Sequence, residues 1–168
     1  MIYLGIDPGI SGAIALVTED GDARVKDMPI FKIEKKKKTK KGNVAFKREI
    51  NAKGVIEILQ PFHHHDLHIF LEDVGVMPGE GAVGAFSFGK GVGILHGIIA
   101  ALGYPCTLVR PQTWKKVMIA GGAGQDKNAA RYRCQQLFPS VDCSLVKHDG
   151  RAEAVLLAEY GRRVLMQK

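Results

Sequence analysis

The sequence has few cysteines, one tryptophan and no long uninterrupted apolar segment. Its three cysteines, Cys106, Cys134 and Cys143, form no Cys-x-x-Cys pair, which argues against a zinc ribbon and against a disulfide framework. We therefore expect reduced thiols in a cytoplasmic protein. No apolar run approaches the roughly 20 residues that a membrane-spanning helix needs, and the N-terminus lacks the basic-then-apolar layout of a secretion signal. These absences predict a protein that has no membrane partner.

Acidic residues are also scarce, and they are unevenly distributed. Against 24 Lys and Arg there are 17 Asp and Glu, which gives a net charge of +7. No acid occurs between Glu80 and Asp126. A basic protein attracts polyanions, and clustered Lys and Arg suit phosphate contacts. The residues that we predict to contact DNA are Lys35, Lys36, Lys37, Lys38, Lys40, Lys41, Lys90, Lys115, Lys116, Lys127 and Arg131.

The lysine run at 35–41 is weak support on its own, because such runs are usually solvated surface. It has no apolar periodicity, so we expect an exposed loop or hairpin tip there. The large aromatic side chains Phe86, Phe88 and Trp114 are expected in the core rather than stacked on bases.

The spacing of apolar residues predicts an α/β protein. Strands are expected at 2–7, 13–17, 24–33, 67–72 and 104–109. Helices are expected at 52–59, at 83–102, from 111, at 126–137 and at 151–165, the first capped by Asn51. Three consecutive strands followed by alternating helices and strands are typical of a mixed sheet flanked by helices. We find no repeat or linker, so residues 1–168 are expected to form a single domain.

Four acidic residues occur where apolar segments end or begin. Asp7 ends the first strand, Glu72 ends the fourth, and Asp149 and Glu153 open the last helix. The simpler interpretations are a turn-forming aspartate and acids that favour a helix N-terminus. Carboxylates packed together repel one another, however, unless a divalent cation lies among them. Oxygen ligands favour Mg²⁺, with Mn²⁺ able to substitute, so the sequence predicts a metal site formed by these four acids.

Spacing indicates which of these side chains share a face. Asp73 follows Glu72, and strand alternation sends the two to opposite faces, so we expect Glu72 to face Asp7. Asp149 and Glu153 are four residues apart, which places them on one face of a helix. For His148 three interpretations remain, namely a metal ligand, a proton carrier and an exposed side chain.

A nucleotide cofactor is not expected. The glycines at 79, 81 and 84 formally match the dinucleotide fingerprint after a strand, but the acid that should follow about 20 residues later is missing. Residues 89–91 (Gly-Lys-Gly) lack the Lys-Ser/Thr that ends a phosphate loop.

Together, these motifs resemble the RuvC-type Holliday-junction resolvases, particularly the forms carried by phages. Residues 5–9 (Gly-Ile-Asp-Pro-Gly) resemble the first metal-binding motif of that family, and Leu71-Glu72 resembles the second. Residues 77–97 and 111–116 are also similar to phage resolvases. Residues 151–154 (Arg-Ala-Glu-Ala) resemble the last motif, which usually reads Ala-Asp-Ala. The motifs follow the order of the family along nearly the whole chain.

The resemblance implies a ribonuclease-H-like fold, two Mg²⁺ ions per active site and a homodimer in which the helix at 83–102 supplies much of the contact. It also implies that Lys115 and Lys127 point toward DNA. One departure concerns the final acidic pair, which in the family is typically three residues apart. Here Gly150 holds the expected position, so Asp149 or His148 is expected to complete the site beside Glu153.

The resulting hypothesis is a metal-dependent, structure-selective DNA endonuclease that resolves four-way junctions by paired nicks, in the cytoplasm of a bacterial cell or phage-infected host. The catalytic residues would be Asp7, Glu72, Asp149 and Glu153, assisted by His148. One alternative is a catalytically silent junction-binding protein. Another is a ribonuclease-H-like nuclease of broader branched-DNA or RNA–DNA hybrid specificity. An actin-like phosphotransferase begins in the same way but needs a duplicated domain, for which the chain is too short.

Overall fold

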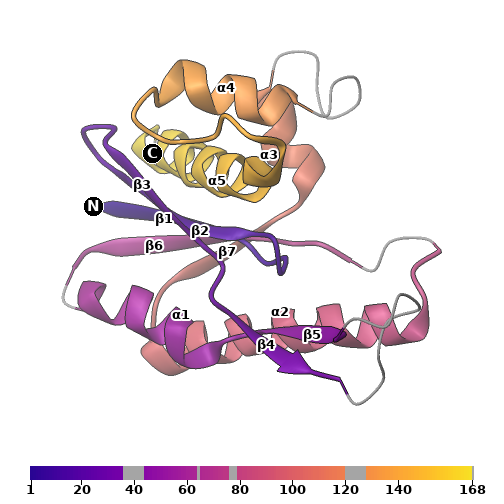
Figure 1. Ribbon diagram of the computed structural model, residues 1–168. Coiled ribbons are helices and arrows are strands. Elements are labelled where there is room, and N and C mark those ends of the chain that lie inside the picture. Colours follow the sequence, from indigo (N-terminus) through magenta and orange to yellow (C-terminus); the bar gives the residue numbers. More distant parts are fainter. Residues whose placement is uncertain (36–43, 64, 76–78, 120–127, 168) are drawn as a thin grey trace.

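The structure is a computed structural model that describes residues 1–35, 44–63, 65–75, 79–119 and 128–167. Its centre is a five-stranded mixed sheet with the order β3-β2-β1-β6-β7 (Figure 1). β1 (Ile2–Asp7) pairs antiparallel with β2 (Ala13–Thr18), which pairs antiparallel with β3 (Ala23–Asp27). On its other side β1 runs parallel to β6 (Leu67–Glu72), and β6 runs parallel to β7 (Cys106–Val109).

Helices cover both faces of this sheet (Figure 1). α5 (Asp149–Met166) lies along one face, together with α3 (Pro111–Met118) and α4 (Ala129–Leu137). α1 (Ala52–Leu59) and α2 (Ala82–Leu102) cover the other face. Single 3₁₀ turns follow α1, as η1 (Gln60–Phe62), and precede α5, as η2 (Val146–His148). The molecule is thus a helix–sheet–helix sandwich with one apolar core on each side of the sheet.

Small residues bring α5 unusually close to the sheet. A Cβ atom at Gly5 would lie 2.1 Å from the carbonyl oxygen of Ala154 and 2.5 Å from the backbone nitrogen of Ala158. A Cβ at Gly161 would lie 2.1 Å from the ring of Phe70. Because the contact at Gly5 is between backbones, no side-chain movement can make room for a larger residue. The close position of α5 over β1 therefore requires glycine at position 5.

The segment expected to form one strand at 24–33 forms two strands, which belong to different sheets. Instead of a single strand at 24–33, the chain leaves β3 at Asp27 and begins β4 (Ile30–Glu34), which pairs antiparallel with β5 (Phe46–Ile50). Pro29 lies at the break and has no N–H to continue a ladder. β5 was not expected, because the charged residues 47–49 (Lys-Arg-Glu) conceal its alternation.

The helices follow the expected pattern closely. Asn51 caps α1, and its Oδ1 accepts a hydrogen bond from the backbone N–H of Gly54 at 3.1 Å. α2 ends at Gly103, which has φ of 69° as expected for a glycine C-cap. The last helix begins two residues earlier than expected, at Asp149. The helix expected at 126–137 is α4, and the segment 120–127 lies outside the described residues.

Two expectations from composition have different outcomes. All three cysteines are free thiols, and the Sγ atoms of buried Cys134 and Cys143 lie 3.2 Å apart. The expectation that no segment is long and apolar enough to span a bilayer is wrong, because α2 meets both criteria. Only 22% of this apolar stretch is buried.

Candidate metal centre

Asp7 and Glu72 lie next to each other at the ends of parallel neighbouring strands. Ile6 and Leu71 are paired in the register of β1 and β6, and the two acids follow directly. Strand alternation places both acids on the α5 face, because Tyr3 and Phe70 of the same strands lie in the core on that side. The expectation that Glu72, and not Asp73, faces Asp7 is therefore confirmed.

Asp7 is held at the turn between β1 and β2 and is partly buried. Its Oδ1 accepts a hydrogen bond from the backbone N–H of Gly9 at 3.1 Å. Burial, the largest cause, raises the pKa of Asp7 to about 7; the Gly9 N–H opposes this rise, and the charges of Glu153 and Glu72 add to it. The negative charges of Glu153 and Glu72 thus both disfavour the ionisation of Asp7.

Glu72 is buried, with 6% of its surface exposed. Burial raises its pKa, while a hydrogen bond from Trp114 acts in the opposite direction. The indole Nε1 of Trp114, on α3, donates this bond to Oε1 of Glu72 at 2.9 Å. The charge of Glu153 also raises the pKa of Glu72, so all three carboxylates interact.

Glu153 comes from α5, where it projects toward the ends of β1 and β6. The Lys115 ammonium donates a hydrogen bond to Oε1 of Glu153 at 2.6 Å. The positive charge of Lys115 also lowers the pKa of Asp7 and of Glu72. Lys115 therefore supplies the positive charge among the three carboxylates.

The chemistry of this group fits a divalent cation. All available donors are carboxylate oxygens, the ligands that hard divalent cations prefer, and the pKa of Asp7 is raised first by burial and then by the charges of Glu153 and Glu72. In the described part of the chain, no three His, Cys, Asp or Glu side chains are already grouped as ligands. Lys115 engages one oxygen of Glu153 and Trp114 engages one oxygen of Glu72, which leaves the second oxygen of each acid for a cation.

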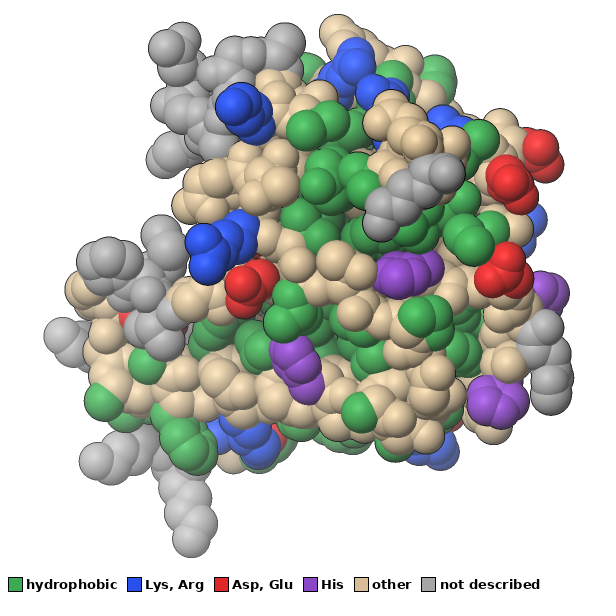
Figure 2. Space-filling model, turned by 180° about the vertical axis from the view of Figure 1, so that it is seen from behind, with side chains coloured by type: hydrophobic (Ala, Val, Ile, Leu, Met, Phe, Trp, Pro, Cys, Tyr) green, Lys and Arg blue, Asp and Glu red, His purple; other side chains and the backbone are tan. Residues whose placement is uncertain are grey.

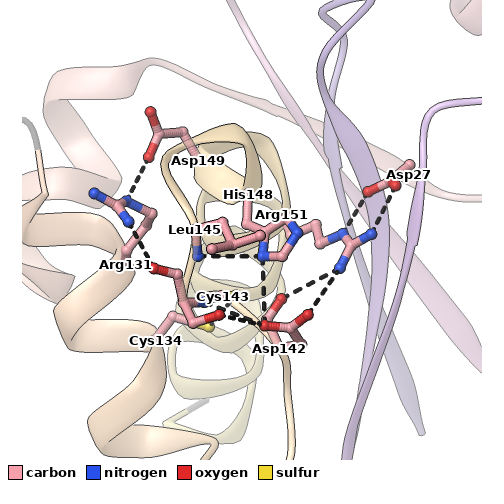
Figure 3. Close-up of polar contacts among 10 residues, drawn as sticks. Asp27, Arg131, Cys134, Asp142, Cys143, Leu145, His148, Asp149 and Arg151 are labelled. Carbon is pink, nitrogen blue, oxygen red and sulfur yellow. Dashed lines mark hydrogen bonds and ion pairs between the residues drawn. The ribbon is translucent and has the colours of Figure 1, made fainter.

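Asp149 and His148 contact partners other than these three carboxylates (Figure 3). Asp149 Oδ1 forms an ion pair with Arg131 Nε at 2.8 Å. His148 is buried, and its Nδ1 contacts the Asp142 carboxylate at 3.4 Å and the backbone N–H of Leu145. Helical spacing places Asp149 and Glu153 on one face of α5, but Asp149 forms its ion pair with the guanidinium of Arg131 on α4. Both side chains thus have other partners in this structure, and their assignment to the metal site stays a prediction.

Gly150 explains why the family spacing is absent. A Cβ at this position would lie 2.3 Å from the carbonyl oxygen of Ser11 and 2.9 Å from Asp7 Oδ2. An acidic side chain cannot occupy position 150 unless α5 or the turn after β1 moves. The missing acid is therefore a consequence of how closely α5 approaches Asp7.

The predicted DNA-contacting residues have mixed surroundings. Lys116 is exposed on α3, and Lys35 is exposed after β4. Lys90 forms an ion pair with Glu49 at 2.7 Å. Lys36, Lys37, Lys38, Lys40, Lys41 and Lys127 lie outside the described residues.

Arg131 does not fit a DNA contact, and this prediction is corrected. Its side chain is 7% exposed. Besides the ion pair with Asp149, its guanidinium donates hydrogen bonds to the Ser144 carbonyl and to the Asn128 side chain (Figure 3). A basic residue in an amphipathic helix can face inward when it finds acceptors, which the linear sequence does not reveal.

The aromatic residues also differ from one another. Trp114 is fully buried, as expected, but its hydrogen bond to Glu72 could not be read from the sequence. Phe86 was expected in the core and is instead 72% exposed on α2.

Comparisons with known proteins support the fold and the resemblance. No protein-family model matches the chain. Among curated proteins, the chloroplastic Holliday junction resolvase MOC1 of Chlamydomonas reinhardtii is 27% identical over 148 residues. The match covers 80% of this chain but 17% of that protein, so the chain spans about a sixth of the length of the curated relative.

Solved structures with the same fold include two of Thermus thermophilus RuvC. RuvC in complex with a Holliday junction substrate superposes with a TM-score of 0.63 at 15% identity, covering 99% of this chain and 96% of that one. A second RuvC structure gives a TM-score of 0.57 at 18% identity, covering 99% and 97%. The chain therefore has the ribonuclease-H-like fold of RuvC, and its resemblance to the RuvC-type Holliday-junction resolvases is confirmed.

Proposed function

We propose that the protein is a metal-dependent endonuclease that resolves four-way DNA junctions by paired nicks. The observation that carries this proposal is the group of three carboxylates, Asp7, Glu72 and Glu153, which burial and mutual repulsion leave short of positive charge. The group lies in a protein of net charge +7, which favours a polyanionic substrate. The relatives named above are a Holliday junction resolvase and RuvC bound to a Holliday junction.

Asp7, Glu72 and Glu153 would hold the Mg²⁺ ions. When bound, such ions supply an activated water and stabilise the departing oxygen of the phosphodiester. The protein itself orients the ligands. The Gly9 N–H fixes Asp7, and Trp114 fixes Glu72. Lys115, which contacts Glu153, would supply a positive charge for a phosphate of the cleaved strand.

The direct test is cleavage of a synthetic four-way junction with and without Mg²⁺, beside a linear duplex of the same sequence. We expect paired nicks in the junction only, and only when Mg²⁺ is present, because the carboxylates need the cation to engage a phosphate. Binding without cleavage at any Mg²⁺ or Mn²⁺ concentration would identify a silent junction-binding protein. Equal cleavage of an RNA–DNA hybrid, a fork or a flap would identify a broader nuclease.

We further propose that the protein acts as a homodimer through α2. This helix is long and apolar yet largely exposed, with Val83 82% and Phe86 72% exposed. Added Cβ atoms at Gly89, Gly93 and Gly97 would meet nothing within 4 Å. These glycines recur every fourth residue on one face, where a second helix can approach closely. Figure 2 shows apolar side chains at the surface of the molecule as seen from behind. Two-fold symmetry suits paired nicks in a junction.

Replacing Gly93 by Leu is expected to yield a monomer, because a bulky side chain prevents close helix approach without disturbing the isolated subunit. Light scattering after size-exclusion chromatography measures the mass. The matched control is Gly75→Leu, at another glycine with open space around it but outside α2. If Gly93→Leu stays dimeric, the dimer interface is not formed by this face of α2.

We also propose a cytoplasmic location, which agrees with the free thiols.

A further inference from the structure

We propose that Trp114 is a positioning residue of the metal centre, which holds one carboxylate oxygen of Glu72 and leaves the other for the cation. This inference rests on the proposed function, because it assigns Glu72 as a metal ligand. The indole Nε1 donates to Glu72 Oε1 at 2.9 Å, in a buried environment. Within the described residues, this bond ties α3 to the end of β6.

The surroundings of Trp114 make this hydrogen bond rigid. Its side chain is fully buried and packs in the core between the sheet, α4 and α5. The indole cannot turn away from Glu72 without opening this core. Pro111 begins the helix that carries Trp114, so the start of α3 is also conformationally restricted. The packing that fixes the Trp114 side chain therefore also fixes the position of Oε1 of Glu72.

The chemistry of the indole suits a positioning role rather than metal ligation or proton transfer. An indole N–H is a donor only and does not titrate, so it neither competes for the cation nor exchanges protons. The neighbouring Lys115 differs, because its ammonium binds Glu153 at the end of a flexible side chain that is 19% exposed. α3 thus presents a fixed partner to Glu72 and a displaceable partner to Glu153.

The expected effect is a loss of metal affinity that exceeds any loss of folding. Groups that hydrogen-bond to metal ligands typically contribute about 10- to 100-fold in metal affinity. We expect Trp114→Phe to raise the Mn²⁺ dissociation constant by about that factor. Free Mn²⁺ is measured by electron paramagnetic resonance in the absence of DNA, so the readout does not depend on cleavage. Met118→Ala is the matched control, because Met118 is a buried residue of α3 without a side-chain hydrogen bond to Glu72.

The chain offers a sharper test, because Trp114 is its only tryptophan. Replacing it by benzothienylalanine substitutes sulfur for the N–H and keeps the shape of the ring, whereas 4-fluorotryptophan keeps the N–H. We expect weakened Mn²⁺ binding with the first and wild-type binding with the second. These analogues also settle the case in which Trp114→Phe fails to fold.

The outcomes separate this inference from the proposed function. If benzothienylalanine binds Mn²⁺ as tightly as tryptophan does, or if Met118→Ala weakens binding equally, the positioning role is overturned while the metal centre stands. If the wild-type protein binds no Mn²⁺, both proposals fall.

Discussion

Replacing Asp7 by Asn is expected to abolish cleavage of a four-way junction while leaving junction binding intact. Asp7 is central to the carboxylate group, and Asn supplies no charge to hold a divalent cation. Loss of such a cation removes several kcal/mol of transition-state stabilisation, so we expect a fall of about 10³-fold or more in cleavage rate. Single-turnover nicking and gel-shift binding measure the two properties separately.

The same substitution is expected to preserve or increase folding stability without metal. The pKa of Asp7 is raised from 3.8 to about 7 in the folded protein. Its stabilising contribution is therefore complete below about pH 4 and is lost as the pH rises through about 7. Asn removes this loss. Urea unfolding at pH 8 without divalent cations should thus show Asp7→Asn to be at least as stable as the wild type.

The matched control is Asp73→Asn, which makes the same chemical change at an exposed acid that directly follows Glu72. This variant should cleave like the wild type. Undiminished cleavage by Asp7→Asn would remove Asp7 from the site, and loss of DNA binding together with cleavage would indicate a structural role instead.

Replacing Gly150 by Ala is expected to destabilise the protein, although alanine is the better helix former. The new Cβ would lie 2.3 Å from the Ser11 carbonyl oxygen and 2.7 Å from Gly12 Cα. Both are backbone atoms, so the first turn of α5 must move away from the turn after β1. Overpacking of this kind costs about 1–3 kcal/mol, and we expect the upper end of that range in the free energy of unfolding.

Urea denaturation checks this prediction, with Gly75→Ala as the control. An added Cβ at Gly75 meets nothing within 4 Å, and such surface changes usually stay within about 0.5 kcal/mol. We also expect Gly150→Ala to weaken Mn²⁺ binding, because the same Cβ would lie 2.9 Å from Asp7 Oδ2. A Gly150→Ala protein as stable as the wild type would mean that α5 is free to shift over β1.

Strand patterns predicted the principal acids because alternation is a local property. Asp7 and Glu72 end apolar segments, and the faces of β1 and β6 follow from a period of two. Once β1 and β6 pair in parallel, the residues that end the two strands lie side by side. Glu153 was predicted together with Asp149 at the start of the last helix, and the resemblance favoured Glu153 of the two. Its position beside Asp7 and Glu72 depends on how α5 packs on the sheet.

The surroundings of the acids could not be predicted, because they depend on contacts distant in sequence. Arg131 binds Asp149 across two helices, and Trp114 reaches Glu72 over 42 positions. The residues next to Arg131 and Trp114 in the sequence do not indicate which acid each side chain contacts. Gly150 was recognised as a departure from the family spacing, but its cause appears only when α5 is seen against the turn after β1.

The separate β4–β5 ribbon has a consequence for how proteins of this shape diversify. Its strands pair with each other and not with the five-stranded sheet in the described part of the chain. Insertions or deletions between Glu34 and Phe46 therefore leave the register of β1 and β6 untouched. New segments can therefore be attached at this ribbon in engineered variants without changing the strands that carry Asp7 and Glu72.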